Sequence, residues 1–147
     1  DYVLEDYDKF EEVADIDFHI KKLSKQMEEM SLKMTTRIFG VEILVAGYDN
    51  RNEPLLYKID PSGNISSWSA YSIGKYQSES LNNLEENYDE SINLSDAITL
   101  AMESINIDEN MNYEPEDFQG CYISEEDGYN QIETKTIADN LNTGDKE

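Results

Sequence analysis

The side chains in this 147-residue sequence that could catalyse a reaction or bind a metal do not form a recognisable set. There is one histidine, His19, and one cysteine, Cys121, so the usual ligands of a zinc site cannot be assembled. A Cys–His nucleophilic pair needs both side chains within hydrogen-bond reach, and nothing in the sequence around either residue indicates one. We therefore expect a core role for the Cys121 thiol and a surface or helix-flanking position for His19.

Carboxylates are so numerous, at 33 Asp and Glu, that an acid/base pair in the sequence carries no information. Asp108-Glu-Asn-Met-Asn112 begins like a calcium-binding loop, but its sixth position is Tyr113 instead of Gly, and its twelfth is Gln119 instead of Glu. There is no glycine-rich phosphate-binding motif and no basic-aromatic patch. We predict no catalytic residue, no cofactor-binding residue and no metal ligand in this chain.

The formal net charge of −22 is the main bulk property of the chain. From Tyr76 to Thr134 there is no Lys or Arg, while sixteen Asp and Glu occur. Such a field repels nucleic acid and anionic membranes, so we expect neither as a partner. The single cysteine excludes an internal disulfide and fits the reducing cytosol or nucleus. We interpret the acidity as a solvated surface, with basic partner surfaces as the alternative.

Residues 13–34 show the apolar spacing of a helix, with intervals of three and four that place one set of side chains on a single face. Lysines and glutamates cover the other face. This pattern favours a helix lying on a sheet over a coiled coil. The apolar set is Val13, Ile16, Ile20, Leu23, Met27, Met30 and Met34.

Three strands are predicted next, at Val41–Ala46, Leu55–Ile59 and Ile65–Ser72. Asp49–Pro54 has the composition of the first turn. Asp60-Pro61-Ser62-Gly63 has a proline at its second position and a glycine that can take a positive φ, which indicates the second turn. The pattern predicts an antiparallel meander with Trp68 and Ala70 on one face.

The second half of the sequence predicts two helices, a hairpin and a short helix. Ser78 is the expected N-cap of the first helix, and Asn93-Leu-Ser-Asp96 resembles a capping box for the second. Glu125-Glu-Asp-Gly128 indicates a hairpin, followed by a helix around residues 137–141. The expected apolar faces are Leu81, Leu84 and Tyr88 on the first helix, and Leu94, Ala97, Ile98, Ala101, Met102 and Ile105 on the second. The class is α+β, and we expect one domain across residues 1–147, with residues 1–12 and 142–147 irregular or disordered.

Several short motifs follow one another along the chain: Arg37-Ile-Phe-Gly-Val41, Gly47-Tyr-Asp49, Leu56-Tyr-Lys-Ile-Asp-Pro-Ser-Gly63, Ala70-Tyr-Ser-Ile-Gly-Lys75, Leu84-Glu-Glu-Asn-Tyr88 and Leu94-Ser-Asp-Ala-Ile98. In this order they resemble the proteasome α-type subunits, over about Lys21 to Leu141. Ile38 replaces the family's usual proline before the first strand.

The resemblance implies the αββα four-layer sandwich of the N-terminal-nucleophile hydrolases, here apparently incomplete at its N-terminal half. It also implies a non-catalytic subunit in the outer ring of the 20S core particle, which gates the passage of substrates and docks regulators in ubiquitin-dependent degradation. The implied partners are other proteasome α and β subunits and regulatory particles or activators, in the cytoplasm and nucleus. The position in the α ring stays open.

Two alternatives remain. A catalytic β-type subunit would need an N-terminal Thr, whereas this sequence opens at Asp1 and Thr35-Thr36 is internal. The β-type Gly-Ser-Gly is also replaced by Ser72-Ile-Gly-Lys75. The other alternative is a stand-alone acidic helical adaptor that docks through the apolar stripe of residues 13–34.

Overall fold

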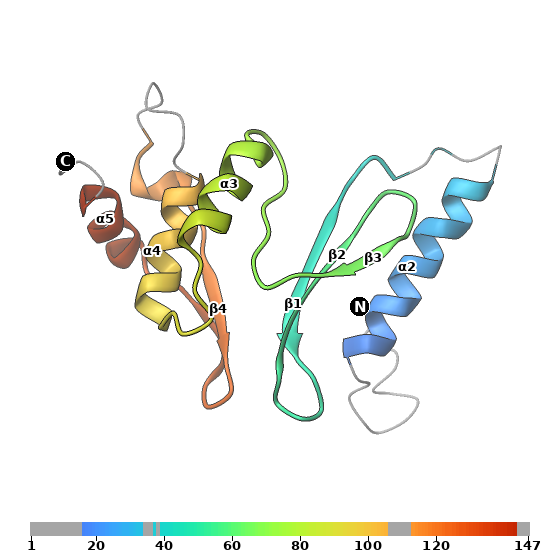
Figure 1. Cartoon of the computed structure of the whole chain (residues 1–147), viewed down its shortest axis with the longest axis horizontal. Coiled ribbons are helices and arrows are strands. Elements are labelled where there is room, and N and C mark those ends of the chain that lie inside the picture. Colours follow the sequence, from blue (N-terminus) through green and yellow to red (C-terminus); the bar gives the residue numbers. More distant parts are fainter. Residues whose placement is uncertain (1–15, 34–36, 38, 106–112, 144–147) are drawn as a thin grey trace. The chain divides into compact units, whose positions relative to one another are not determined.

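The computed structural model describes residues 16–33, 37, 39–105 and 113–143. The chain divides into two compact units, Asp1–Ser69 and Ala70–Glu147. Within the described residues the order is one helix, three strands, two helices, a short 3-10 helix, two strands and a helix. The predicted order of helices and strands is therefore confirmed, and the mixture of helices with antiparallel sheets matches the predicted α+β class (Figure 1).

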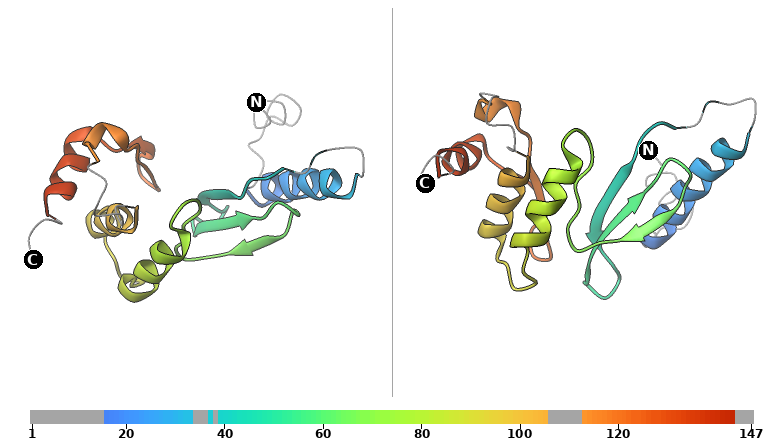
Figure 2. Two further views of the ribbon diagram at one scale, coloured as in Figure 1. Left: turned by 90° about the horizontal axis from the view of Figure 1, so that it is seen from above. Right: turned by 45° about the horizontal axis from the view of Figure 1, so that its top comes forward.

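The first unit is a three-stranded antiparallel sheet with a helix on one face. Helix α2 (Ile16–Leu32) precedes the strands β1 (Ile43–Tyr48), β2 (Pro54–Ile59) and β3 (Ile65–Ser67), with β2 in the centre. In the register, Ile43 lies opposite Ile59 and Val45 opposite Tyr57. These four residues pack with Ile20 and Met27 of α2, as a helix on a sheet requires. Figure 2 shows α2 lying along this face.

The second unit contains α3 (Gln77–Asn87), α4 (Leu94–Ile105), the 3-10 helix η1 (Pro115–Asp117), β4 (Cys121–Ser124), β5 (Gly128–Gln131) and α5 (Thr134–Thr143). Helices α3 and α4 pack side by side (Figure 2), and Asn83 Nδ2 of α3 donates to Ser104 Oγ of α4 at 2.9 Å. Leu100 and Ile137 are the buried apolar side chains here. The predicted hairpin is confirmed, with Ser124 opposite Gly128.

Three details differ from the sequence-based expectation. Strand β3 ends at Ser67 instead of Ser72, because its pairing with β2 stops there. Ile65 is paired with Ile59, and the last pair is Ser67 with Tyr57. The N-cap of α3 is Tyr76, in the left-handed region at φ 61°, and not Ser78. On α4 the buried positions are Leu100 and Ser104, whereas Leu94 and Ile105 of the predicted face are exposed.

The prediction of a single domain with irregular ends stays a prediction. Residues 1–12 and 144–147 lie outside the described residues, and α5 runs to Thr143. Among the helices that the structure describes, none combines the length and the apolar character needed to cross a membrane.

Candidate functional site

The residues considered for chemistry do not form a reactive centre in the part of the chain that the structure describes. His19 lies on α2 with its ring edge-on to Phe18, 5.7 Å between centroids. Cys121 begins β4 and is exposed, so the expected core role of its thiol is wrong. Thr35-Thr36 and Asp108–Asn112 lie outside the described residues. No three or more His, Cys, Asp or Glu side chains in the described ranges are placed to hold a metal ion.

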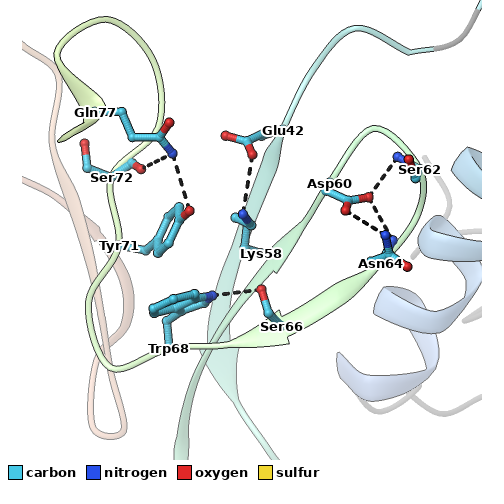
Figure 3. Close-up of polar contacts among 10 residues, drawn as sticks. All are labelled: Glu42, Lys58, Asp60, Ser62, Asn64, Ser66, Trp68, Tyr71, Ser72 and Gln77. Carbon is cyan, nitrogen blue, oxygen red and sulfur yellow. Dashed lines mark hydrogen bonds and ion pairs between the residues drawn. The ribbon is translucent and has the colours of Figure 1, made fainter. Parts of the chain in front are cut away.

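The turn from Asp60 to Asn64 contains a network of polar contacts (Figure 3). The Gly63 amide donates to the Asp60 carbonyl at 2.9 Å, and the Asp60 amide donates to the Asn64 carbonyl at 3.0 Å. The Asp60 carboxylate accepts from the amides of Ser62 and Asn64 at Oδ1, at 2.8 and 3.0 Å, and from Asn64 Nδ2 at Oδ2, at 2.8 Å. Both carboxylate oxygens thus satisfy turn groups, which is a structural use of Asp60.

Gly63 joins this turn to helix α2. Its φ is +90°, a conformation that a side chain disfavours. A Cβ at this position would lie 2.6 Å from the Ser24 carbonyl oxygen and 2.9 Å from the Glu28 amide nitrogen, both backbone atoms of α2. The Ser24 hydroxyl donates to the Gly63 carbonyl oxygen. Only glycine fits here, because the turn backbone lies directly on the helix backbone.

The electrostatics of Asp60 follow from this geometry. The hydrogen bond from the Asn64 side chain, helped by the amides of Asn64 and Ser62, lowers the pKa of the carboxyl below its ordinary value of 3.8. Asp49 repeats the arrangement at the other end of β2, where its Oδ1 accepts from the amides of Arg51 and Glu53 at 2.8 and 2.9 Å. The Glu53 amide is the main cause of the lowered pKa of Asp49. Carboxylates with lowered pKa values are ionised at neutral pH and are poor general bases.

The sheet face opposite α2 carries a short polar line. Strand alternation places Lys58 and Ser66 on this face, and they are register partners. Lys58 Nζ lies 3.4 Å from Glu42 Oε1, and both side chains are partly buried. Trp68 Nε1 donates to Ser66 Oγ at 2.8 Å (Figure 3). These contacts all lie within the first unit and join side chains of the strands and of the residues next to them.

The segment before α3 shows a second strained turn. Gly74 has φ 110° and Tyr76 has φ 61°. Gln77 Nε2 donates to the Ser72 carbonyl at 3.1 Å and to Tyr71 Oη at 3.4 Å, and Lys75 Nζ lies 4.4 Å from the centroid of the Tyr76 ring. Side-chain bonds thus fix the start of the helix in place of an N-cap side chain.

Sequence reasoning identified the Asp60–Gly63 turn but missed Ser24, which holds it to α2. The available signal was a polar residue on the apolar face of the helix, one turn after Ile20. A hydroxyl at such a position usually has a specific hydrogen-bond partner.

Comparisons with known proteins identify a family and several relatives. Residues 2–123 match the sequence model of a family described as "Proteasome subunit". The chain is 38% identical over 96 residues to "Proteasome subunit alpha type-2" of Oryza sativa subsp. indica, covering 65% of this chain and 40% of the relative. It is 41% identical over 83 residues to "Proteasome subunit alpha type-2-A" of Arabidopsis thaliana, covering 56% of this chain and 35% of the relative. It is 35% identical over 99 residues to "Proteasome subunit alpha type-2" of Dictyostelium discoideum, covering 67% of this chain and 42% of the relative. The chain thus spans about two fifths of the length of the relatives it matches.

Proposed function

This chain belongs to the proteasome subunit family, and we propose that it is a non-catalytic α-type subunit of the 20S core particle. In this role it forms part of the outer ring, which gates the passage of substrates and docks regulators in ubiquitin-dependent protein degradation. The observation that carries the proposal is the match to the family over residues 2–123, a stretch that includes the Asp60–Gly63 turn packed on α2.

The α-type assignment is supported by the names of the three relatives given above, each of which is called alpha type-2. We propose the same ring position for this chain, which the motifs alone left open. A structural role also agrees with the site geometry. The polar groups of the Asp60–Asn64 turn and the Gln77 side chain at the start of α3 form hydrogen bonds within their own turns.

The fold proposed with this function is the αββα four-layer sandwich of the N-terminal-nucleophile hydrolases, with residues 1–147 as part of one such domain. Helix α2 on the β1–β2–β3 sheet would form one helix layer and one sheet of this sandwich. The proposed partners are the neighbouring α and β subunits and regulatory particles, in the cytoplasm and nucleus.

The test is to express the chain with an affinity tag in its own cells and purify it under native conditions. We expect it in a large particle together with other α and β subunits, identified by mass spectrometry. The Gly63→Val variant, in which the turn cannot pack on α2, is expected to be lost from the particle. Recovery of the tagged chain only as a small species would favour the adaptor alternative.

The second part of the proposal is the lack of catalysis. Purified chain is expected to show no hydrolysis of fluorogenic peptides. Steady hydrolysis that disappears in Cys121→Ala or His19→Ala would overturn it, since these are the remaining candidates for a nucleophile and a base.

A further inference from the structure

Helix α2 has a second face, on the side away from the residues that pack on the sheet. Its inner face is Ile16, Ile20, Leu23 and Met27, which pack on the strands, together with Ser24 at the Gly63 turn. Six residues on the opposite side of the helix, at helical spacing, together with Lys33 directly after it, define what we call the outer face. They are Phe18, Lys21, Lys22, Lys25, Glu29, Leu32 and Lys33.

The charge of the outer face is opposite to that of the whole chain. It has four lysines and one glutamate, with the exposed Glu28 at its edge, whereas the chain has a net charge of −22 and only 11 Lys and Arg. Lys21, Lys25 and Lys33 are exposed. No ion pair is found for Lys21 or Lys25 within the described residues. More than a third of the cationic side chains of the chain are therefore gathered on one helix face.

The outer face also carries two large exposed apolar side chains. Phe18 is 49% exposed and Leu32 is 73% exposed. They are fourteen positions apart, which corresponds to about 21 Å along a helix. Lys22 Nζ lies 5.8 Å from the centroid of the Phe18 ring, within the range of a cation–π contact that keeps this ring in the outer face. Apolar side chains at both ends with lysines between them form a surface with a defined length.

We propose that the outer face of α2 binds an acidic polypeptide segment of a partner protein, with carboxylates facing Lys21 and Lys25 and apolar side chains covering Phe18 and Leu32. Charge complementarity selects the carboxylates, and the two exposed apolar residues select a polypeptide over nucleic acid. Nucleic acid is further disfavoured because its dense charge is repelled by the rest of the chain. The inference rests on α2 alone and goes beyond the proposed proteasome role.

The rest of the chain gives this binding a particular salt dependence. At low ionic strength, where the Debye length is about 30 Å, the acidic bulk of the chain repels an acidic peptide. Near 0.15 M salt this length falls to about 8 Å, so the nearby lysines dominate. At about 1 M salt the lysines are screened as well. Affinity should therefore pass through a maximum with increasing salt.

The experiment uses the full 147-residue chain and a fluorescein-labelled helical peptide with glutamates between two leucines spaced as Phe18 and Leu32 are. Fluorescence anisotropy gives the affinity at each salt concentration. We expect Lys25→Glu to weaken binding by about three- to tenfold near physiological salt, the range for reversing one exposed charge pair. Lys135→Glu, an equal charge change at an exposed position of α5, is the matched control and should change the affinity much less. Leu32→Ser should also weaken binding, and Ile105→Ser, at a similarly exposed apolar position of α4, should not.

Equal losses in Lys25→Glu and Lys135→Glu, or no binding of the peptide at any salt concentration, would overturn the proposal. Self-association of the chain that Lys25→Glu abolishes would show that a second copy occupies the face, and would also overturn it. If the peptide bound only after the Asp and Glu of residues 1–12 were changed to Asn and Gln, the occupant would be the chain's own N-terminal segment. That result would also overturn the proposal. Circular dichroism of every variant checks that the total helix content is unchanged. None of these outcomes depends on whether the chain enters a proteasome particle.

Discussion

At the scale of single residues, Gly63 has the strictest requirement for glycine among the glycines that the structure describes. Two effects act there together, the positive φ and the contact with the backbone of α2. Gly74 shows only the first of these two effects, because its φ is 110° but nothing lies within 4 Å of an added Cβ. The two glycines therefore measure how much of the sensitivity comes from backbone strain and how much from the packing of the turn on the helix.

We predict that Gly63→Ala lowers the free energy of unfolding by about 2–4 kcal/mol, the sum of left-handed strain and overpacking against α2. Gly63→Val should cost at least as much. Gly74→Ala should cost only about 1–2 kcal/mol, from the strain alone. Urea unfolding of the three variants measures these differences. A neutral Gly63→Val would show that the turn does not pack on α2 as described.

Asp60 gives a prediction for pH. Its folded-state pKa is lowered, so its carboxylate stabilises the fold above the ordinary value of 3.8, and this contribution is lost as the pH falls through the folded pKa. Asp60→Asn should be mild at neutral pH, because its amide oxygen can still accept from the Ser62 and Asn64 amides. The difference in Tm between wild type and Asp60→Asn should shrink below pH 3.8. Thermal melts across this range test it, and a severe loss of function in Asp60→Asn with an unchanged Tm would instead identify a site.

At the scale of elements, α2 is fixed to the sheet mainly by Met27 and Ile20, which are 1% and 3% exposed. We predict that Met27→Ala destabilises the first unit by about 2–5 kcal/mol, through lost burial and the cavity it leaves. Leu32→Ala, at a residue 73% exposed, is the control and should cost under about 0.5 kcal/mol. Trp68 is the single tryptophan and lies in this unit, so its fluorescence follows the unfolding. Equal effects of the two substitutions would contradict the packing of α2.

Helix α4 begins with the predicted asparagine cap. Asn93 Oδ1 accepts from the Asp96 amide at 3.0 Å, and Asn93 Nδ2 donates to Asp96 Oδ2 at 2.6 Å. Asn93→Ala should therefore cost about 1 kcal/mol, while Asn93→Ser, which keeps an acceptor, should cost much less. Helix-sensitive circular dichroism during urea unfolding distinguishes the two variants. If serine and alanine were equally damaging, the cap bond would not be the cause.

Local patterns predicted the order of elements, both turns and the cap of α4, because each of these depends on neighbouring residues. They failed where the answer depends on distant partners. The alternating pattern of Ile65–Ser72 could not show that β3 pairs with β2 only up to Ser67, whose partner is Tyr57. The buried face of α4 was missed because it contains Ser104, a polar side chain whose partner is Asn83 on another helix. Cys121 was placed in a core because its exposure depends on what covers one face of the hairpin.

At the scale of the whole molecule, the described residues bury little apolar surface. Five hydrophobic side chains are buried, while twelve large ones are exposed, among them Tyr129 at 69% and Ile105 at 58%. Such exposure is more typical of a part that is completed by neighbours than of an independent domain. The net charge of −22 adds self-repulsion, which also weakens the compact state.

We therefore predict that the isolated chain is more loosely packed than the assembled chain and prone to aggregate at high concentration, so that the unfolding comparisons above need dilute protein. Assembly with its partners should correct this. Strand β1 lies at an edge of the described sheet, with β2 on one side only, whereas β2 is paired on both sides. In hydrogen exchange, the β1 amides of the isolated chain should be protected less than those of β2, and should gain protection in the purified particle. The isolated chain should also bind an apolar dye and melt broadly. A sharp two-state melt of a monomer, with β1 as protected alone as in the particle, would mean that the chain folds as a complete domain without partners.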